Sequence, residues 1–188
     1  MEFSADNLRQ RNRKLRAQLN KDALELAASQ LFDRISVLPE FINASKIATY
    51  SAVNGEISLN SIIDLALEMG KQIYLPNLDL KSLRFSPYFH GQKMRINRFR
   101  LPEPDVTDDE MLAPEPLDLV LAPLVVFDPQ RNRIGMGGGY YDRTLAPIRR
   151  DSLQTQLIGL AHTCQQADML QTDNWDIPLN GISTPDQF

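Results

Sequence analysis

One nearly continuous apolar run constrains the fold more than any other segment: it extends from Leu117 to Phe127 and reads LDLVLAPLVVF. A run of this kind is typical of a strand that is buried on both of its faces. Such a strand needs helices above and below it, as in the parallel sheets of α/β proteins. The run therefore predicts a sheet that lies between two helical layers.

The remaining segments alternate between helical and extended patterns. We expect helices from Ser4 to Asn20, from Asn20 to about Val37 with Pro39 stopping it, from Ser58 to Gly70, and from about Tyr140 to Ala146. In these helices Ser4, Asn20 and Ser58 are the expected N-caps, and Gly70 is the expected residue after the C-terminus. Further strands are expected at Lys46–Val53, Lys71–Leu75, Leu83–Tyr88 and Leu157–Ala161.

The stretch from Leu101 to Pro116 differs, because it holds four of the twelve prolines, and we expect a surface connection with one helical turn near Asp108–Leu112. Strands that alternate with helices around apolar central strands predict a three-layer α/β/α sandwich with a largely parallel, Rossmann-like sheet. With 188 residues, we expect a single domain over residues 1–188.

Composition narrows the environment in which the protein works. The net charge of −4 gives no general attraction to nucleic acid or to an anionic membrane. The one cysteine, Cys164, cannot form an internal disulfide, which suits a reducing compartment. The polar N-terminus does not resemble a secretory signal, and no segment approaches the ~18 apolar residues of a membrane span. We expect a cytoplasmic monomer without nucleic-acid or membrane partners.

The most informative motif is RIGMGGGYYDR, from Arg133 to Arg143. Four of the nine glycines fall within five of its positions, between a predicted buried strand and the start of a helix. Glycines allow successive backbone N–H groups to converge on an anion, and a helix N-terminus adds positive potential. The two arginines could pair with phosphate oxygens, and Asp142 offers a carboxylate for a Mg²⁺ ion that bridges phosphates.

Alone, this motif predicts a phosphate site. It has no Lys-Ser/Thr pair of a Walker loop and does not match the dinucleotide fingerprint. The alternative is a glycine-rich turn that binds no ligand.

With its flanking strand and helix, the motif resembles the signature of the 5-formyltetrahydrofolate cyclo-ligase family, the 5,10-methenyltetrahydrofolate synthetases. The shared signature is Phe127-Asp128 followed by Arg133-Ile-Gly-x-Gly-x-Gly-Tyr-Tyr-Asp142. The resemblance covers nearly the whole chain through weaker elements: Leu8-Arg9, Tyr50-Ser51, Gly55-Glu56-Ile57, Pro102-Glu103-Pro104, Trp175-Asp176-Ile177-Pro178 and Ser183-Thr184-Pro185. Many members carry basic residues where this chain has Met136 and Gly138, and the family's N-terminal lysine falls at Ala5. The glycine loop is similar to that of bacterial members.

The resemblance implies an ATP- and Mg²⁺-dependent enzyme that converts 5-formyltetrahydrofolate, with or without a polyglutamate tail, to 5,10-methenyltetrahydrofolate, ADP and phosphate through a phosphorylated formyl group (an iminium phosphate). It implies catalytic roles for Arg133, Tyr140 and Asp142. The implied ATP contacts are Arg9, Arg13, Arg133, Ile134, Gly135, Met136, Gly137, Gly138, Gly139, Tyr140 and Tyr141. The implied folate contacts are Ser51, Glu56, Phe99, Met136, Gly137, Gly138, Gly139 and Tyr140. The implied metal ligands are Asp142 and Asp176.

Two other functions stay open: a phosphosugar isomerase or transferase on a similar sheet, and a non-catalytic nucleotide-binding module. Glu56 separates them from the folate enzyme, since only that function gives this remote acid a role. His162 and Cys164 would suit a thiol hydrolase, although a small buried cysteine near an incidental histidine is the commoner arrangement. For the basic cluster Arg9, Arg11, Arg13, Lys14 and Arg16 we expect a solvated helix face, from which one or two side chains reach ATP.

Overall fold

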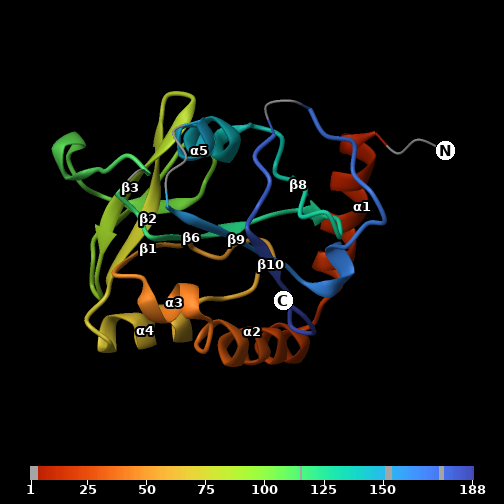
Figure 1. The fold of residues 1–188 in the computed structure, drawn as a ribbon, viewed down its shortest axis with the longest axis horizontal. Helices are drawn as coiled ribbons and strands as arrows, with labels where there is room; N and C mark the ends of the chain where they lie inside the picture. The colour runs from red at the N-terminus through yellow and green to blue at the C-terminus, as the bar shows by residue number, and fades with distance from the viewer. Residues whose placement is uncertain (1–3, 115, 151–153, 174–175) are drawn as a thin grey trace.

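A six-stranded sheet forms the centre of the protein (Figure 1). The computed structural model describes residues 4–114, 116–150, 154–173 and 176–188. The strand order is β10-β9-β6-β1-β2-β3, and every neighbouring pair is parallel except β2 and β3. The strands are β1 (Lys46–Ala48), β2 (Gln72–Asp79), β3 (Ser82–Tyr88), β6 (Leu119–Pro123), β9 (Gln156–Leu160) and β10 (Gly181–Ser183). The predicted, largely parallel sheet is confirmed.

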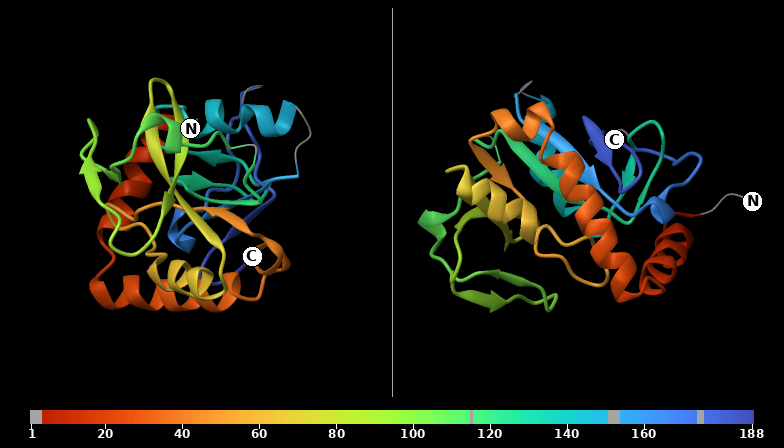
Figure 2. Two further views of the ribbon diagram at one scale, coloured as in Figure 1. Left: turned by 90° about the vertical axis from the view of Figure 1, so that its left-hand side faces the viewer. Right: turned by 90° about the horizontal axis from the view of Figure 1, so that it is seen from below.

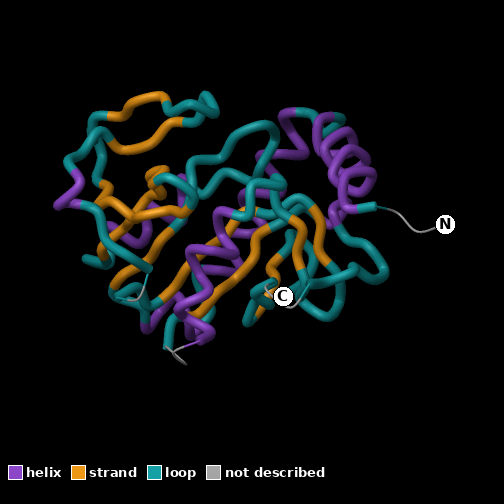
Figure 3. Tube along the Cα trace, turned by 90° about the horizontal axis from the view of Figure 1, so that it is seen from above, coloured by secondary structure: helices purple, strands orange, loops and turns teal. Residues whose placement is uncertain are grey.

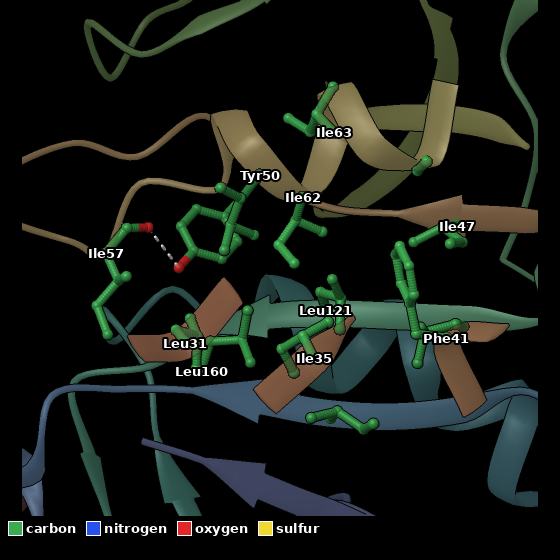
Figure 4. Close-up of a cluster of buried hydrophobic side chains, with 14 of the residues drawn as sticks. Leu31, Ile35, Phe41, Ile47, Tyr50, Ile57, Ile62, Ile63, Leu121 and Leu160 are labelled. Atoms are coloured by element: carbon green, nitrogen blue, oxygen red, sulfur yellow. Dashed lines mark hydrogen bonds between the residues drawn. The ribbon is translucent and has the colours of Figure 1, made fainter. Parts of the chain in front are cut away.

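Helices cover both faces of this sheet (Figures 1 and 2). One face carries α2 (Lys21–Ile35), α3 (Pro39–Asn43) and α4 (Asn60–Glu68), and the other carries α5 (Tyr140–Arg150), which crosses above the strands in Figure 3. Each helical layer has its own apolar core against the sheet, and Figure 4 shows the core beneath α2, α3 and α4. This is the three-layer α/β/α arrangement.

Helix α1 (Ala5–Ala17) lies outside these layers. It packs against a small two-stranded hairpin of β7 (Val126–Phe127) and β8 (Arg133–Ile134). A third apolar cluster joins the helix to this hairpin, and Leu8, Val126 and Ile134 belong to it. As a result, the N-terminal helix lies against the segment that leads directly into the glycine loop.

The two N-terminal helices begin where their capping residues predict. The Ser4 side chain accepts a hydrogen bond from the Asn7 amide, and the Asn20 side chain accepts one from the Ala23 amide. The predicted role of Gly70 is also confirmed, because it follows α4 with φ of 74°. Ser58 is a different case: α4 begins at Asn60, and its N-cap residue, Leu59, makes no side-chain capping bond.

Several other boundaries differ from those expected: β2 continues to Asp79 rather than Leu75, and α5 continues to Arg150 rather than about Ala146. Pro39 does not stop α2, which ends at Ile35, but begins the short α3, where its missing N–H costs no hydrogen bond. The strand expected at Lys46–Val53 ends at Ala48. After it the chain leaves the sheet, and Tyr50 turns its ring into the core while its hydroxyl donates to the Ile57 carbonyl at 3.0 Å (Figure 4).

The apolar run from Leu117 to Phe127 forms two strands in two different sheets. It leaves the main sheet after Pro123, which has no N–H for the ladder, and continues as β7 in the small hairpin. Val125 and Val126 are buried there as completely as the residues of β6, in the cluster beneath α1. The glycine loop therefore follows the hairpin strand β8 rather than a strand of the main sheet.

The segment from Leu101 to Pro116, expected to be a surface connection, contains an additional strand. Its residues Pro102–Pro104 form β5, which pairs with β4 (Met94–Ile96), and the expected helical turn is η1 (Asp108–Glu110). Two side-chain contacts attach this hairpin to β2. The Asn77 amide donates to the Pro104 carbonyl at 2.8 Å, and the buried Glu103 carboxylate accepts the Leu78 amide at 3.1 Å.

Candidate functional site

The glycine loop joins β8 to the N-terminus of α5. Gly137 and Gly139 have φ values of 98° and 62°, in the left-handed region that side chains other than glycine rarely adopt. A Cβ atom at Gly137 would lie 3.5 Å from the Arg9 guanidinium, and one at Gly139 only 2.6 Å from Nη1 of Arg143. The loop therefore needs glycine both for its backbone path and for the side chains that close over it.

Two arginines of α1 reach this loop. Nε of Arg9 donates to the Gly135 carbonyl at 3.0 Å, and Nη2 of Arg13 donates to the Met136 carbonyl at 3.3 Å. A cavity of about 470 Å³ lies between the helix and the loop, and Arg9, Arg13 and Met136 contribute to its lining. The structure thus brings the predicted N-terminal basic residues to the predicted phosphate site.

Arg133 and Asp142 form an ion pair at the base of the loop. Nη2 of Arg133 donates to Oδ1 of Asp142 at 2.7 Å, and the two side chains are 3% and 24% exposed. Nε of Arg133 is buried and has no hydrogen-bond partner among the described residues. The loop expected to present Arg133 to phosphate therefore presents it already neutralised by Asp142.

Two other residues of the motif, Ile134 and Tyr140, lie in different surroundings. The Ile134 side chain is in the core with Leu8, whereas Tyr140 lies toward the β4–β5 hairpin. Its ring meets that of Phe99 edge to face at 5.8 Å between centroids, and its hydroxyl accepts a hydrogen bond from Arg98 at 2.6 Å. The structure therefore brings Phe99 and Tyr140 together from distant parts of the chain.

A second, larger cleft of about 940 Å³ contains two of the predicted folate residues, whereas Phe99, Met136 and Tyr140 are not among the residues that line it. Its lining includes Ser51 and Glu56, together with side chains of α2 such as Lys21 and Phe32. The Glu56 side chain is 10% exposed. Its Oε2 accepts the Val53 amide at 3.1 Å, and its Oε1 lies 3.7 Å from Nη1 of Arg16.

Burial dominates the electrostatics of this cleft. It raises the pKa of Glu56, and the Val53 N–H and the Arg16 charge act in the opposite direction. Burial also raises the pKa of Tyr141, and the nearby Glu56 charge raises it further while Arg133 lowers it. Helix α1 links the two regions, because Arg13 contacts Met136 of the glycine loop and Arg16, three residues later, contacts Asn54 in the lining of the cleft. The two predicted subsites are therefore adjacent.

The two predicted metal ligands differ in their surroundings. Asp142 keeps an oxygen beyond the one that pairs with Arg133, while Oδ2 of Asp176 accepts the Asp173 amide at 2.8 Å. Trp175 lies outside the described residues. Within the described ranges, no group of three or more His, Cys, Asp or Glu side chains could hold a metal ion. Asp142, beside the glycine loop, is the type of donor that suits Mg²⁺, which usually takes one or two carboxylates and completes its shell with phosphate oxygens and water.

The sequence-based expectation was wrong for Arg16 and Cys164, and it did not include Arg98. Arg16, expected on a solvated face, is 2% exposed, and its spacing of four from Asn12 and eight from Leu8, both buried, was the signal. Arg98 had no sequence signal, because its contact with Tyr140 exists only in the folded chain. Cys164 is exposed rather than buried, and Nε2 of His162 contacts the Gly55 carbonyl at 2.9 Å.

Together these features define an α/β protein in which a glycine loop contacted by arginines lies beside a cleft that contains a largely buried carboxylate. The model of the 5-formyltetrahydrofolate cyclo-ligase family matches residues 2–185. The chain belongs to the 5-formyltetrahydrofolate cyclo-ligase family.

Individual relatives agree with this family. The 5-formyltetrahydrofolate cyclo-ligase of Escherichia coli K12 is 34% identical over 95% of this chain and 96% of its own length. That of Haemophilus influenzae is 37% identical over 90% and 91%. The solved 5,10-methenyltetrahydrofolate synthetase of Aquifex aeolicus has a TM-score of 0.82 at 26% identity, covering 97% of this chain and 90% of that one. The synthetase of Mycoplasma pneumoniae shares the fold, with a TM-score of 0.78 at 22% identity over 97% and 99%.

Proposed function

We propose that this chain converts 5-formyltetrahydrofolate and ATP to 5,10-methenyltetrahydrofolate, ADP and phosphate. Its family is ATP-dependent in general. The observation that carries the proposal is the adjacency of a phosphate-type glycine loop and a cleft of about 940 Å³ that contains the largely buried Glu56. That volume lies within the range of small-molecule sites, and a pterin offers adjacent N–H donors to a carboxylate.

The chemistry asks for positioning and charge neutralisation. A formamide oxygen is a poor leaving group, so ATP first phosphorylates it and leaves as ADP. The neighbouring secondary amine then attacks the activated carbon and loses its proton, and the C–O bond to phosphate breaks. No protein nucleophile is needed, because the protein has only to hold the reactants in line and stabilise developing phosphate charge.

The geometry supports a division of roles. Arg9, Arg13 and the amides from Gly135 to Tyr141 would hold the polyphosphate, with Arg133 and Asp142 fixing the base of the loop. Ser51 and Glu56 would hold the pterin, and the Phe99–Tyr140 pair would close over it. Asp142 and Asp176 would hold Mg²⁺, and the ion would supply neutralisation of the phosphate charge. We also propose that the protein works as a cytoplasmic monomer with one domain; no helix among the described residues is long and apolar enough to cross a membrane.

One assay separates this function from its rivals. The protein is incubated with 5-formyltetrahydrofolate and Mg-ATP, and the methenyl chromophore is followed in the near ultraviolet. We expect its appearance to depend on both substrates. A phosphosugar enzyme would give no chromophore and need no ATP. A nucleotide-binding module would bind ATP, yet would leave the folate unchanged.

A further inference from the structure

Arg16 lies at the C-terminal end of α1, and its side chain contacts the turn that carries Glu56. Its side chain is 2% exposed, and Nε donates to the Asn54 carbonyl at 2.9 Å. Nη1 lies 3.7 Å from Oε1 of Glu56 and has no hydrogen-bond partner among the described residues. A buried guanidinium with an unsatisfied N–H is costly, so its position requires an explanation.

The turn itself is held from two sides. Asn54 and Gly55 have φ values of 50° and 77°, and a Cβ atom at Gly55 would lie 3.3 Å from Cγ of Arg16. On the other side, Nε2 of His162 contacts the Gly55 carbonyl at 2.9 Å. The turn therefore has little freedom to move away from Arg16, and the distance between the arginine and Glu56 is set by the fold.

That distance has a functional consequence. A pair made only for stability would approach to about 2.7–2.9 Å and would use the carboxylate's acceptor positions itself. At 3.7 Å the positive charge still acts on the carboxylate through a low-dielectric environment, while Oε1 stays available as an acceptor for a ligand. Glu56 also lines the large cleft, so a ligand there can reach it.

We propose that Arg16 is a positioning residue that keeps Glu56 ionised and directed into the cleft, and so determines folate affinity without touching folate. The inference rests on the proposed function, because it assumes that Glu56 binds the pterin.

The pH dependence follows from the groups that face Glu56. These are Arg16 from α1, Tyr50 after β1 and Tyr141 from α5, with His162 behind Gly55, and Lys21 and Glu25 of α2 line the same cleft. Burial lowers the pKa of His162, which favours the neutral ring, so Arg16 is the cation that opposes the burial of Glu56. Without Arg16, the pKa of Glu56 rises further. Folate binding that needs the carboxylate then fails at a higher pH as the solution is made more acidic.

Arg16→Met tests this inference, with Arg16→Lys as the conservative variant and Arg11→Met, an exposed change on the same helix, as the matched control. In Arg16→Met we expect the KM for 5-formyltetrahydrofolate to rise by about 10- to 100-fold, the range of a lost charge-assisted interaction. The KM for ATP should change by less than about twofold, and the acid limb of folate binding should move to higher pH. Arg16→Lys should restore part of the affinity and of the pH profile, and should serve if Arg16→Met does not fold.

A double-mutant cycle with Glu56→Gln completes the test. If Arg16 acts through the charge of Glu56, adding Arg16→Met to Glu56→Gln should weaken folate binding little further. An unchanged folate KM and pH profile in folded Arg16→Met would overturn the inference, as would equal losses for ATP and folate. If Glu56→Gln itself leaves folate affinity unchanged, the assigned pterin contact is wrong. A wild-type protein without methenyl product would instead remove the proposed function.

Discussion

The carboxylate of Glu56 lies in surroundings that oppose its charge, since burial is the largest influence on its pKa. Replacing it with glutamine keeps the shape but removes the charge and one acceptor. We expect folate affinity to fall by about one to two orders of magnitude, because charge-assisted hydrogen bonds contribute about 1.5–3 kcal/mol. ATP affinity should stay nearly unchanged. Calorimetric titration of both ligands into Glu56→Gln and into the exposed control Glu68→Gln measures this, and equal losses of both ligands would contradict it.

Asp142 combines a contact with a predicted catalytic role. It pairs with the buried Arg133 and is also a proposed Mg²⁺ ligand. For Asp142→Asn we expect turnover to fall more than ATP affinity, because neutralisation of phosphate charge matters most as phosphoryl transfer proceeds. Stability should also fall, by less than the ~3–5 kcal/mol of a fully buried broken pair, since Asp142 is 24% exposed. Steady-state kinetics at saturating Mg²⁺ and urea unfolding measure the two effects, and normal turnover would remove the assigned role.

At the scale of elements, the glycine loop depends on backbone geometry that only glycine supplies easily. Gly137→Ala and Gly139→Ala each place a methyl group at a positive φ, against Arg9 in the first case and Arg143 in the second. We expect weak ATP binding with the fold intact. Gly70→Ala is the matched control, because Gly70 also has a positive φ but a Cβ atom there would meet nothing within 4 Å. It should lose about 1 kcal/mol of stability and no ATP affinity. Unchanged nucleotide affinity in both loop variants would mean that the loop is only a turn.

The sequence predicted those elements that are determined by residues close to one another along the chain. Capping side chains located the starts of α1 and α2, and the glycine motif located the loop. The pairing partners of short strands are not local, so β4, β5, β8 and β10 left no recognisable pattern. The apolar run could not reveal its own break, because hydrophobicity reports burial and not which of two cores buries a residue. In the same way, Arg9 could be assigned from the family motif, but the burial of Arg16 depends on a turn 38 residues away.

At the scale of the whole molecule, ATP consumption should depend on folate. The carboxylates beside the loop are Asp6 and Asp142, and they are paired with Arg9 and Arg133 respectively. No free general base is therefore in place among the described residues of the loop to activate water. We expect negligible ADP release from Mg-ATP alone and rapid release after 5-formyltetrahydrofolate is added. Equal rates of ADP release with and without folate would contradict the proposed mechanism.

Helix α1 contacts both predicted subsites: Arg9 and Arg13 touch the glycine loop, and Arg16 touches the turn that carries Glu56. Its 13 residues span about 20 Å as one rigid body. A change that nucleotide binding makes in the position of this helix therefore also affects the folate site. Linkage requires that folate binding change nucleotide affinity by the same factor. Each ligand should therefore change the other's affinity by a common factor, measurable by titrating each ligand in the absence and presence of a non-reacting analogue of the other. Coupling in which each ligand strengthens the other would let the protein release its reduced folate when ATP is scarce instead of sequestering it.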